Sequence, residues 1–290
     1  NITGYYPAAV KIFNQSHRVT CNDNLVIDLP NSNGIWYDVG NVDGVFTNNW
    51  VEGVGRTNFN IATNQLWPSD NGFFFEISKG VVCAGNVFVN CDHGLMILNS
   101  SNALIYQNTF INSMACIGRN ERSSAGDHFG WHPSTGPDVD KRDGHIFVNN
   151  LLTGDKDFRR PLLFGWQPAL LCKQLTAPEL KQLDHNVYIR KSFNAADTLI
   201  LWSPSSNEYC QTAFKSLDGL KKIYPEFSAH SNFYSNYEGP MFQGPEIKNY
   251  KLLKTFAGSN SGMKLPPDIR KLLSVSKEKL NYIGAYPPID

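Results

Sequence analysis

Two acidic residues end two short, similar stretches of the sequence, and an aromatic residue lies two positions before each acid. The first stretch, GIWYD, ends at Asp38, and the second, GFFFE, ends at Glu76. A pair of carboxyl groups can cleave a glycosidic bond when one acts as nucleophile or base and the other as general acid. The alternative is a polar surface that carries two acids by coincidence. The choice depends on the elements that position them.

The two stretches belong to an internal repeat. A glycine begins three successive copies, at Gly34, Gly72 and Gly94, and the last step is 22 residues. An asparagine follows at a nearly fixed distance in four copies, at Asn24, Asn48, Asn86 and Asn108. Short β-branched and aromatic runs with turn residues at a period near 22 predict a parallel β-helix. The recurring asparagines are expected to form an internal ladder whose side chains hydrogen-bond the neighbouring coil's backbone.

The repeat suggests how the chain is organised. We expect residues 1–160 to form coils that bear the acids, with about 16 inserted residues between Glu52 and Asp70, a fifth coil near Cys116 and a strand at 145–150. Residues 161–290 are expected to hold the last coils, with strands at 184–188 and 198–202, and a mixed, partly helical cap. Helices are predicted at 177–183, at 216–223 after a Ser cap, and within 266–282. The abrupt start predicts that an upstream part of the protein is missing.

Alternation along a strand decides which side chains leave the core. It places Trp36 and Asp38 on one face of their strand, and Phe74 and Glu76 on the same face one coil later. Adjacent coils stack about 4.8 Å apart, close to the separation of about 5–5.5 Å that retaining glycosidases use. Two like charges this close also raise one pKa. Exposed Trp36 and Phe74 beside paired acids would form a sugar platform; alone, such aromatics are more often edge packing.

These residues resemble right-handed β-helix glycoside hydrolases, and glycoside hydrolase family 120 (β-xylosidases) in particular. That family carries a Trp-x-Asp strand followed one coil later by a Phe-x-Glu strand. The resemblance covers residues 9–112 and implies a retaining, exo-acting enzyme with Asp38 as nucleophile and Glu76 as general acid/base. It implies an oligosaccharide substrate, with β-xylosides as one option, and no cofactor. Family members are about twice as long, which implies that an upstream half or another subunit completes the site.

Further side chains are candidates for substrate binding. Arg119, Asn120, Glu121 and Arg122 lie one coil beyond Leu98 and could bind sugar hydroxyls or orient Glu76; the alternative is a solvated loop with self-paired charges. His93 precedes Gly94 and is expected close enough to hydrogen-bond Glu76, or to be a turn histidine without a task. Trp67 in the insertion could wall the pocket or pack on the coil below.

Metal binding is not expected. The six cysteines show no CxxC spacing, which argues against a structural zinc site, and one disulfide is compatible with an exported protein. Cys21, Cys83 and Cys91 fit small buried core positions. His and Asp residues at 127–132 and 138–140 have metal-ligand spacing without a third ligand pattern. Trp166 and Trp202 are expected in the core or cap, or lining the cleft.

Composition limits the partners. Lys plus Arg and Asp plus Glu balance at 26 each, which argues against nucleic acid or an anionic membrane as the main partner. No run of 18 apolar residues exists, so we expect no membrane span, and no signal peptide is present in this chain. A bacterial periplasmic or extracellular location is the prediction. Two rival functions are a polysaccharide lyase with a Lys or Arg base and calcium, and a carbohydrate-binding β-helix without turnover.

Overall fold

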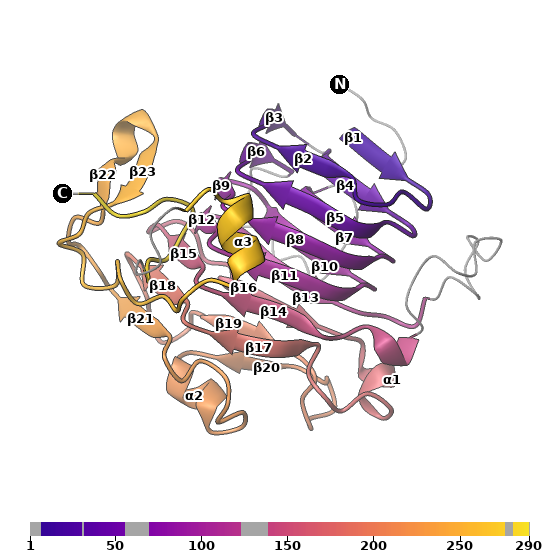
Figure 1. Ribbon diagram of the computed structural model, residues 1–290. Helices are drawn as coiled ribbons and strands as arrows, with labels where there is room; N and C mark the ends of the chain where they lie inside the picture. Colours follow the sequence, from indigo (N-terminus) through magenta and orange to yellow (C-terminus); the bar gives the residue numbers. More distant parts are fainter. Residues whose placement is uncertain (1–6, 31, 56–69, 123–138, 276–280, 290) are drawn as a thin grey trace.

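The chain winds into a stack of coils, each built from short strands that pair with the coil before and after (Figure 1). The computed structural model describes residues 7–30, 32–55, 70–122, 139–275 and 281–289. Successive strands fall into three sheets, here A, B and C, so that the chain returns to the same sheet after each coil. Pairing between coils is parallel throughout the stack. The prediction of a right-handed parallel β-helix is confirmed.

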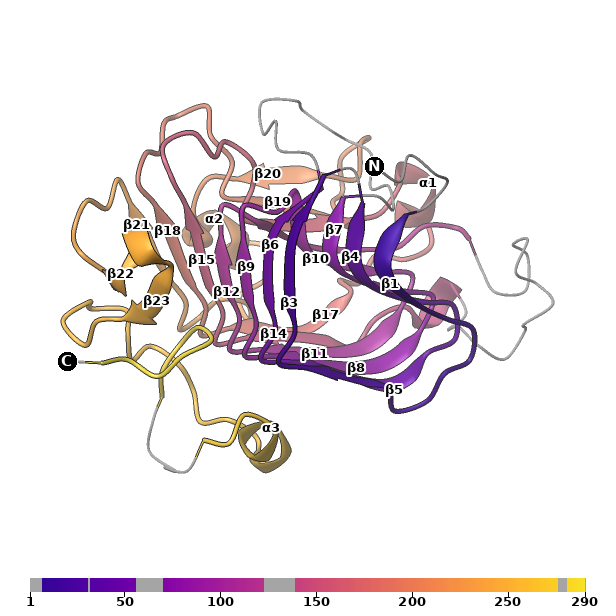
Figure 2. The same cartoon turned by 90° about the horizontal axis from the view of Figure 1, so that it is seen from above.

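The three sheets enclose the axis of the stack, as the view from above shows (Figure 2). Sheet A contains β1 Ala8–Phe13, β4 Asn33–Asp38, β7 Asn71–Glu76, β10 His93–Leu98, β13 Met114–Gly118, β16 Leu163–Trp166, β19 Ile200–Trp202 and the antiparallel β20 Thr212–Phe214. Sheet B contains β2 Thr20–Asn22, β5 Val42–Thr47, β8 Lys79–Ala84, β11 Ser101–Tyr106, β14 His145–Val148 and β17 Leu180–Asp184. Sheet C contains β3 Leu25–Leu29, β6 Trp50–Val54, β9 Val87–Val89, β12 Thr109–Ile111, β15 Leu151–Gly154, β18 Val187–Arg190 and β21 Asn232–Ser235.

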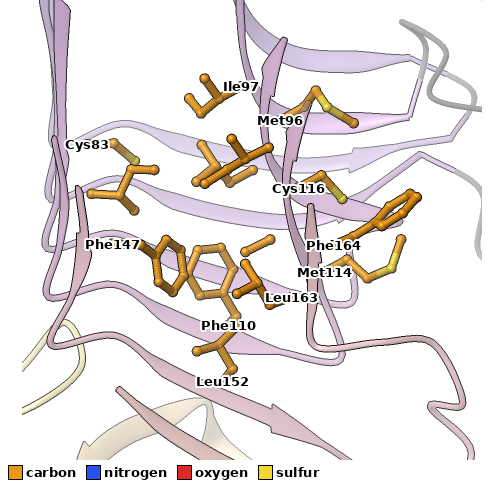
Figure 3. Packing of buried hydrophobic residues seen from close by; sticks show 14 of the residues in the cluster. Cys83, Met96, Ile97, Phe110, Met114, Cys116, Phe147, Leu152, Leu163 and Phe164 are labelled. Carbon is orange, nitrogen blue, oxygen red and sulfur yellow. The ribbon is translucent and has the colours of Figure 1, made fainter. Parts of the chain in front are cut away.

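Aromatic side chains from all three sheets fill the interior. Phe46 of β5 stacks on Phe73 of β7 with ring centroids 4.0 Å apart, and Phe88 of β9 stacks on Phe110 of β12 at 4.9 Å. Figure 3 shows Phe110 and Phe147 on the interior side of sheet A, with Met96, Cys116 and Phe164 on its other side. Large rings stacked coil on coil bury much apolar surface, and each Å² buried stabilises the fold by about 25 cal/mol. This explains why the aromatic positions recur with the coil period.

The repeated glycines and asparagines have separate physical reasons. A Cβ atom at Gly72 would lie 2.7 Å from the carbonyl oxygen of Gly94, and Gly34 and Gly94 are similarly crowded, so the second residue of β4, β7 and β10 has no room for a side chain. The asparagine ladder runs through six coils, each Oδ1 accepting from the backbone N–H of the previous member: Asn24, Asn49, Asn86, Asn108, Asn150 and Asn186. The prediction of Asn48 as the second member was wrong. Asn48 is exposed at φ +55°, and Asn49 is buried.

The C-terminal part follows the last coils and then runs back along the side of the stack, where it packs on strands of sheets B and C. The helix predicted at 177–183 was wrong, because that segment pairs with β14 as strand β17, and the short helix α1 Ala169–Cys172 lies earlier. The predicted helix after Ser216 is confirmed as α2 Leu217–Lys221. Within 266–282, α3 Pro267–Leu272 packs on the outer face of sheet B (Figure 1). The 3₁₀ turns η1 Val139–Lys141 and η2 Pro245–Ile247 and the hairpin β22 Phe242–Gly244 with β23 Asn249–Leu252 complete the elements.

Cysteine usage follows the expected division. Cys83 and Cys91 are buried in the core, and Cys21 is half-buried. Cys172 and Cys210 form a disulfide that links the region of α1 to the segment before β20. No helix in the described part of the chain is long and apolar enough to cross a bilayer.

Candidate functional site

Asp38 and Glu76 are register partners at the ends of neighbouring strands of sheet A. The same column continues with Phe13 on the coil before and Leu98 on the coil after. The two acids are therefore an isolated pair and not part of an acidic stripe, as the repeat predicted.

Alternation puts the acids on the outer face of sheet A. Tyr37 and Phe73 meet edge to face in the interior, with ring centroids 5.4 Å apart. Trp36 and Phe74 stack on each other on the outer face at 5.0 Å. The expectation that these two aromatics form an exposed sugar platform was wrong, because Trp36 is 2% and Phe74 1% exposed.

Both carboxyl groups are buried as well, Asp38 at 1% exposure and Glu76 at 4%. This is burial on the outer face, outside the sheet, so the pair does not lie in the interior of the β-helix. A buried charge is costly unless it is paired. The groups that satisfy these acids therefore decide what the pair can do.

The turn after each acid fixes its backbone. Val39 and Ile77 follow the acids with φ of +40° and +45°, a left-handed conformation that is uncommon for β-branched residues. Asn41 donates its side-chain N–H to the carbonyl oxygen of Asp38 at 2.8 Å, and the hydroxyl of Ser78 donates to that of Glu76 at 2.7 Å. Strain of this kind persists where the surroundings hold it and clusters at functional sites.

One cation serves each acid. Lys11 Nζ lies 2.9 Å from Asp38 Oδ2 and 3.7 Å from the centroid of the Trp36 ring. Arg122 Nη1 lies 2.8 Å from Glu76 Oε1. Among the described residues, Asp38 Oδ1 has no hydrogen-bond partner. Each acid thus has one oxygen held by a cation, and a side-chain hydrogen bond between the two carboxyl groups contributes to the pKa of each.

The two acids influence each other's protonation. Burial, and after it the negative charge of Asp38, raise the pKa of Glu76 to about 8 against the opposing effect of Arg122. Burial also raises the pKa of Asp38, while Lys11 opposes that rise through its hydrogen bond and its charge. Glu76 therefore carries a proton at neutral pH, and Lys11 favours the charged form of Asp38 beside it. This division into an acid and a carboxylate is what two-carboxyl hydrolysis requires.

Among the loop residues predicted to bind substrate or orient Glu76, Arg122 contacts an acid directly and Asn120 supports Arg122. Asn120 exchanges hydrogen bonds with Asn99 and accepts from the backbone N–H of Arg122 at 3.0 Å, so it braces the turn that carries this cation. Arg119 is buried and donates to Gln167 and to the carbonyl oxygen of Ala177, away from the acid pair. Glu121 is exposed.

His93 does not reach Glu76. It begins its strand, where its ring pairs with Asn71 Oδ1 at 2.9 Å, whereas Glu76 aligns with Leu98 at the strand's other end. Five residues at about 3.3 Å each separate the two ends. The predicted contact fails because His93 aligns with Asn71 at the start of β7, whereas Glu76 lies at the end of β7.

Other predicted positions divide between the core and the undescribed segments. Trp202 is buried against Tyr224 and Phe227, and Trp166 aligns with Gly118 in the column of the acids. Trp67, most of the insertion between Glu52 and Asp70, and residues 127–132 and 138 lie outside the described residues.

Sequence reasoning missed Lys11. The signal was present, because Lys11 lies two residues before Phe13, the position aligned with Asp38, and the structure pairs Lys11 with Trp36. Alternation therefore puts the lysine on the face of the acids, one coil earlier. Following each column across all copies, and not only where acids occur, would have found it.

Comparison with known proteins gives one partial match. A family model described as "Periplasmic copper-binding protein (NosD)" matches residues 6–133, fewer than half of the 290 residues. No metal-ligating group of three or more His, Cys, Asp or Glu occurs among the described residues of that span. No curated protein matches the chain, and no solved structure does. The match agrees with a parallel β-helix and gives no support to glycoside hydrolase family 120 as the specific relative.

Proposed function

We propose that the chain carries the catalytic acids of a retaining, exo-acting glycoside hydrolase, with Asp38 as nucleophile and Glu76 as general acid/base. The observation that supports this most is the register pairing of the two acids on adjacent coils. At the ordinary strand spacing of about 4.8 Å, such a pair meets the separation of about 5–5.5 Å used in double displacement. Inverting enzymes need a wider gap, about 6.5–9.5 Å.

The contacts of the pair support the division of roles. Lys11 holds Asp38 Oδ2, so the unpartnered Oδ1 is the atom that attacks the anomeric carbon. Arg122 holds Glu76 Oε1, which leaves Oε2 to carry the proton. The bond from Oδ1 to the anomeric carbon forms while the glycosidic bond breaks and the leaving oxygen takes the proton of Glu76. Glu76 then deprotonates water, which attacks the anomeric carbon and releases Asp38.

Access to the pair runs past its cations. The side chains of Lys11 and Arg122 are 33% and 29% exposed, whereas those of Asp38 and Glu76 are 2% and 5% exposed. A sugar that reaches the acids must therefore displace or share these two cations. Their N–H groups would then bind sugar hydroxyls.

The proposed location is the bacterial periplasm or the extracellular space. The disulfide between Cys172 and Cys210 supports an oxidising compartment, and the partly matching family is described as periplasmic.

A panel of aryl glycosides, beginning with β-xylosides, tests the proposal on the chain itself and on the longest natural protein that contains it. We expect cleavage of at least one member with retention of anomeric configuration. Azide should restore turnover to Asp38→Asn with an inverted glycosyl azide, and to a small variant of Glu76, Glu76→Ala, with a retained one.

Three other outcomes overturn the proposal. Inverted hydrolysis product would exclude Asp38 as nucleophile. An unsaturated uronide product that disappears in chelator would identify a lyase. Sugar binding without any turnover, weakened only modestly by Asp38→Asn and Glu76→Gln, would identify a carbohydrate-binding β-helix.

A further inference from the structure

A second polar cluster lies at the far end of the stack from the N-terminus, where β17, β18 and β21 meet (Figure 1). Asp184 ends β17, His185 follows in the turn to β18, and His230 lies two residues before β21. Because Val187 aligns with Asn232, the two histidines occupy equivalent positions on neighbouring coils. Their rings stack with centroids 4.7 Å apart and planes 8° from parallel, which is the spacing of the coils themselves.

Asp184 lies against both histidines through one oxygen. Its Oδ2 lies 2.7 Å from His230 Nδ1 and 3.8 Å from His185 Nε2. The backbone N–H of His230 donates to the other oxygen, Oδ1, at 2.7 Å, and this bond fixes the orientation of the carboxylate.

The tautomer of His185 is set from the other side of its ring. Its Nδ1 lies 3.0 Å from the carbonyl oxygen of Ser261, and a carbonyl oxygen can only accept. Nδ1 therefore carries the hydrogen, and in the neutral ring Nε2 is left with a lone pair 3.8 Å from the carboxylate. Two acceptors that face each other in this way are stabilised by a positive charge between them. A backbone carbonyl behind the ring is the usual outer partner of a metal-ligating histidine.

We propose that Asp184, His185 and His230 bind one divalent first-row transition metal ion of the zinc type. Each residue offers one ligand atom, and these atoms lie within 4.8 Å of one another. A tetrahedral ion with bonds of about 2.0–2.2 Å needs ligand atoms about 3.3 Å apart. The two nitrogen–oxygen distances, 2.7 and 3.8 Å, lie on either side of that value. His230 is the exposed member of the cluster and can make the adjustment.

The donor set decides the class of metal. Two imidazoles and one carboxylate suit zinc, copper and nickel, whereas magnesium and calcium prefer oxygen ligands. The ion would replace the hydrogen that His230 Nδ1 shares with Asp184 Oδ2, so binding releases a proton from the site when both histidines are neutral. Water would complete the coordination on the exposed side. The cluster lies outside residues 6–133, the span matched by the copper-binding family model.

The site would join three parts of the chain. Asp184 and His185 belong to one coil, His230 to the next, and Ser261 to the C-terminal segment that holds the ring of His185. An ion at this point would therefore fasten the last coils together and stabilise the folded chain by mass action. The role proposed for the metal is structural and independent of the acids Asp38 and Glu76.

Calorimetric titration of the metal-free full chain with Zn²⁺, repeated with Cu²⁺, Ni²⁺ and Mg²⁺, tests the proposal. The variants are His230→Gln, Asp184→Asn and the double variant His185→Gln/His230→Gln, with His17→Gln as a matched exposed histidine outside the cluster. We expect the wild type to bind one more Zn²⁺ per chain than the double variant. Each single variant should weaken that site at least about tenfold, and Mg²⁺ should not bind there.

Thermal unfolding gives the second readout. Zn²⁺ should raise the Tm of the wild type, of His17→Gln and of Asp38→Asn alike, and it should not raise that of the double variant. Because Asp38→Asn removes the proposed nucleophile, its normal response would separate this site from the proposed hydrolase. Equal Zn²⁺ stoichiometry in the wild type and the folded double variant would overturn the proposal and leave the cluster as a hydrogen-bonded contact.

Discussion

Two polar rows run through the same scaffold, and they are built on different rules. The asparagine ladder extends through six coils, and each side-chain oxygen accepts from the backbone of the member before it. The acid row holds only Asp38 and Glu76 between apolar neighbours, depends on Lys11 and Arg122, and leaves Asp38 Oδ1 without a partner among the described residues. A neutral row whose members satisfy one another's hydrogen bonds stabilises the β-helix. A short charged row that depends on cations from outside it is a candidate for catalysis.

The largest expected effect is the loss of catalytic activity when Asp38, in the acid row, is substituted. Asp38→Asn should lower kcat/KM on the best aryl glycoside by about 10³-fold or more, since the covalent route is lost, while the Tm changes little. Steady-state kinetics on matched preparations of the wild type and the variant measure it. Asn48→Gly, beside the ladder and far along the coil, should keep full activity. A fully active Asp38→Asn would assign the acid row to structure as well.

Stability gives the opposite contrast. Asn49→Leu should destabilise the fold by about 2–4 kcal/mol, because it leaves the partners of Asn49 in Asn24, Cys21 and Asn86 unsatisfied inside the stack. Denaturant unfolding measures the change. Its control is the neighbouring Asn48→Gly, which should be nearly neutral, because Asn48 is exposed at a positive φ that glycine accepts. Equal losses for the two variants would contradict the assigned register of the ladder.

The pH dependence tests the raised pKa of Glu76. Since the acid form is needed, kcat/KM should fall as the pH rises through about 8. The stability that goes with this raised pKa is present in full below the unfolded value of 4.5 and is lost between there and about pH 8. Glu76→Gln should therefore have a higher Tm than the wild type at pH 9, by about 2–4 °C or more, and a smaller advantage at pH 5. An equal advantage at both pH values would contradict the shift.

The smallest predicted effect concerns the cation beside Asp38. Lys11→Met should leave the fold intact but raise the pKa of Asp38 further, so the acidic side of the pH–rate profile should move to higher pH. Activity at the low end of the profile then falls. Lys79→Met, at an exposed lysine on β8, is the control and should leave the profile unchanged. An unaltered acidic side in Lys11→Met would show that Lys11 does not tune Asp38.

Register was the part that sequence could predict. A glycine four residues before each acid aligns Asp38 with Glu76, once an insertion of about 16 residues is added to the 22-residue period. The burial of Trp36 and Phe74 could not be predicted from the sequence, because alternation indicates which face of the sheet a side chain occupies and not what covers that face. Arg119 and Arg122 were indistinguishable for the same reason. The metal cluster was hidden because the period is blurred after residue 160, where His185 and His230 come together only through the pairing of β18 with β21.

The pairing of sheet A strands also fixes the spacing between equivalent residues on successive coils. Backbone positions in one column are separated by whole steps of about 4.8 Å, and the residue after Glu76 in that column is Leu98. Moving the second acid from position 76 to position 98 would open the gap to about 9.6 Å, close to the upper end of the range for inverting hydrolysis. On this scaffold, acids one coil apart fall near the retaining range of separations and acids two coils apart near the inverting range. Two substitutions, one at position 76 and one at position 98, would move the second acid from the first arrangement to the second.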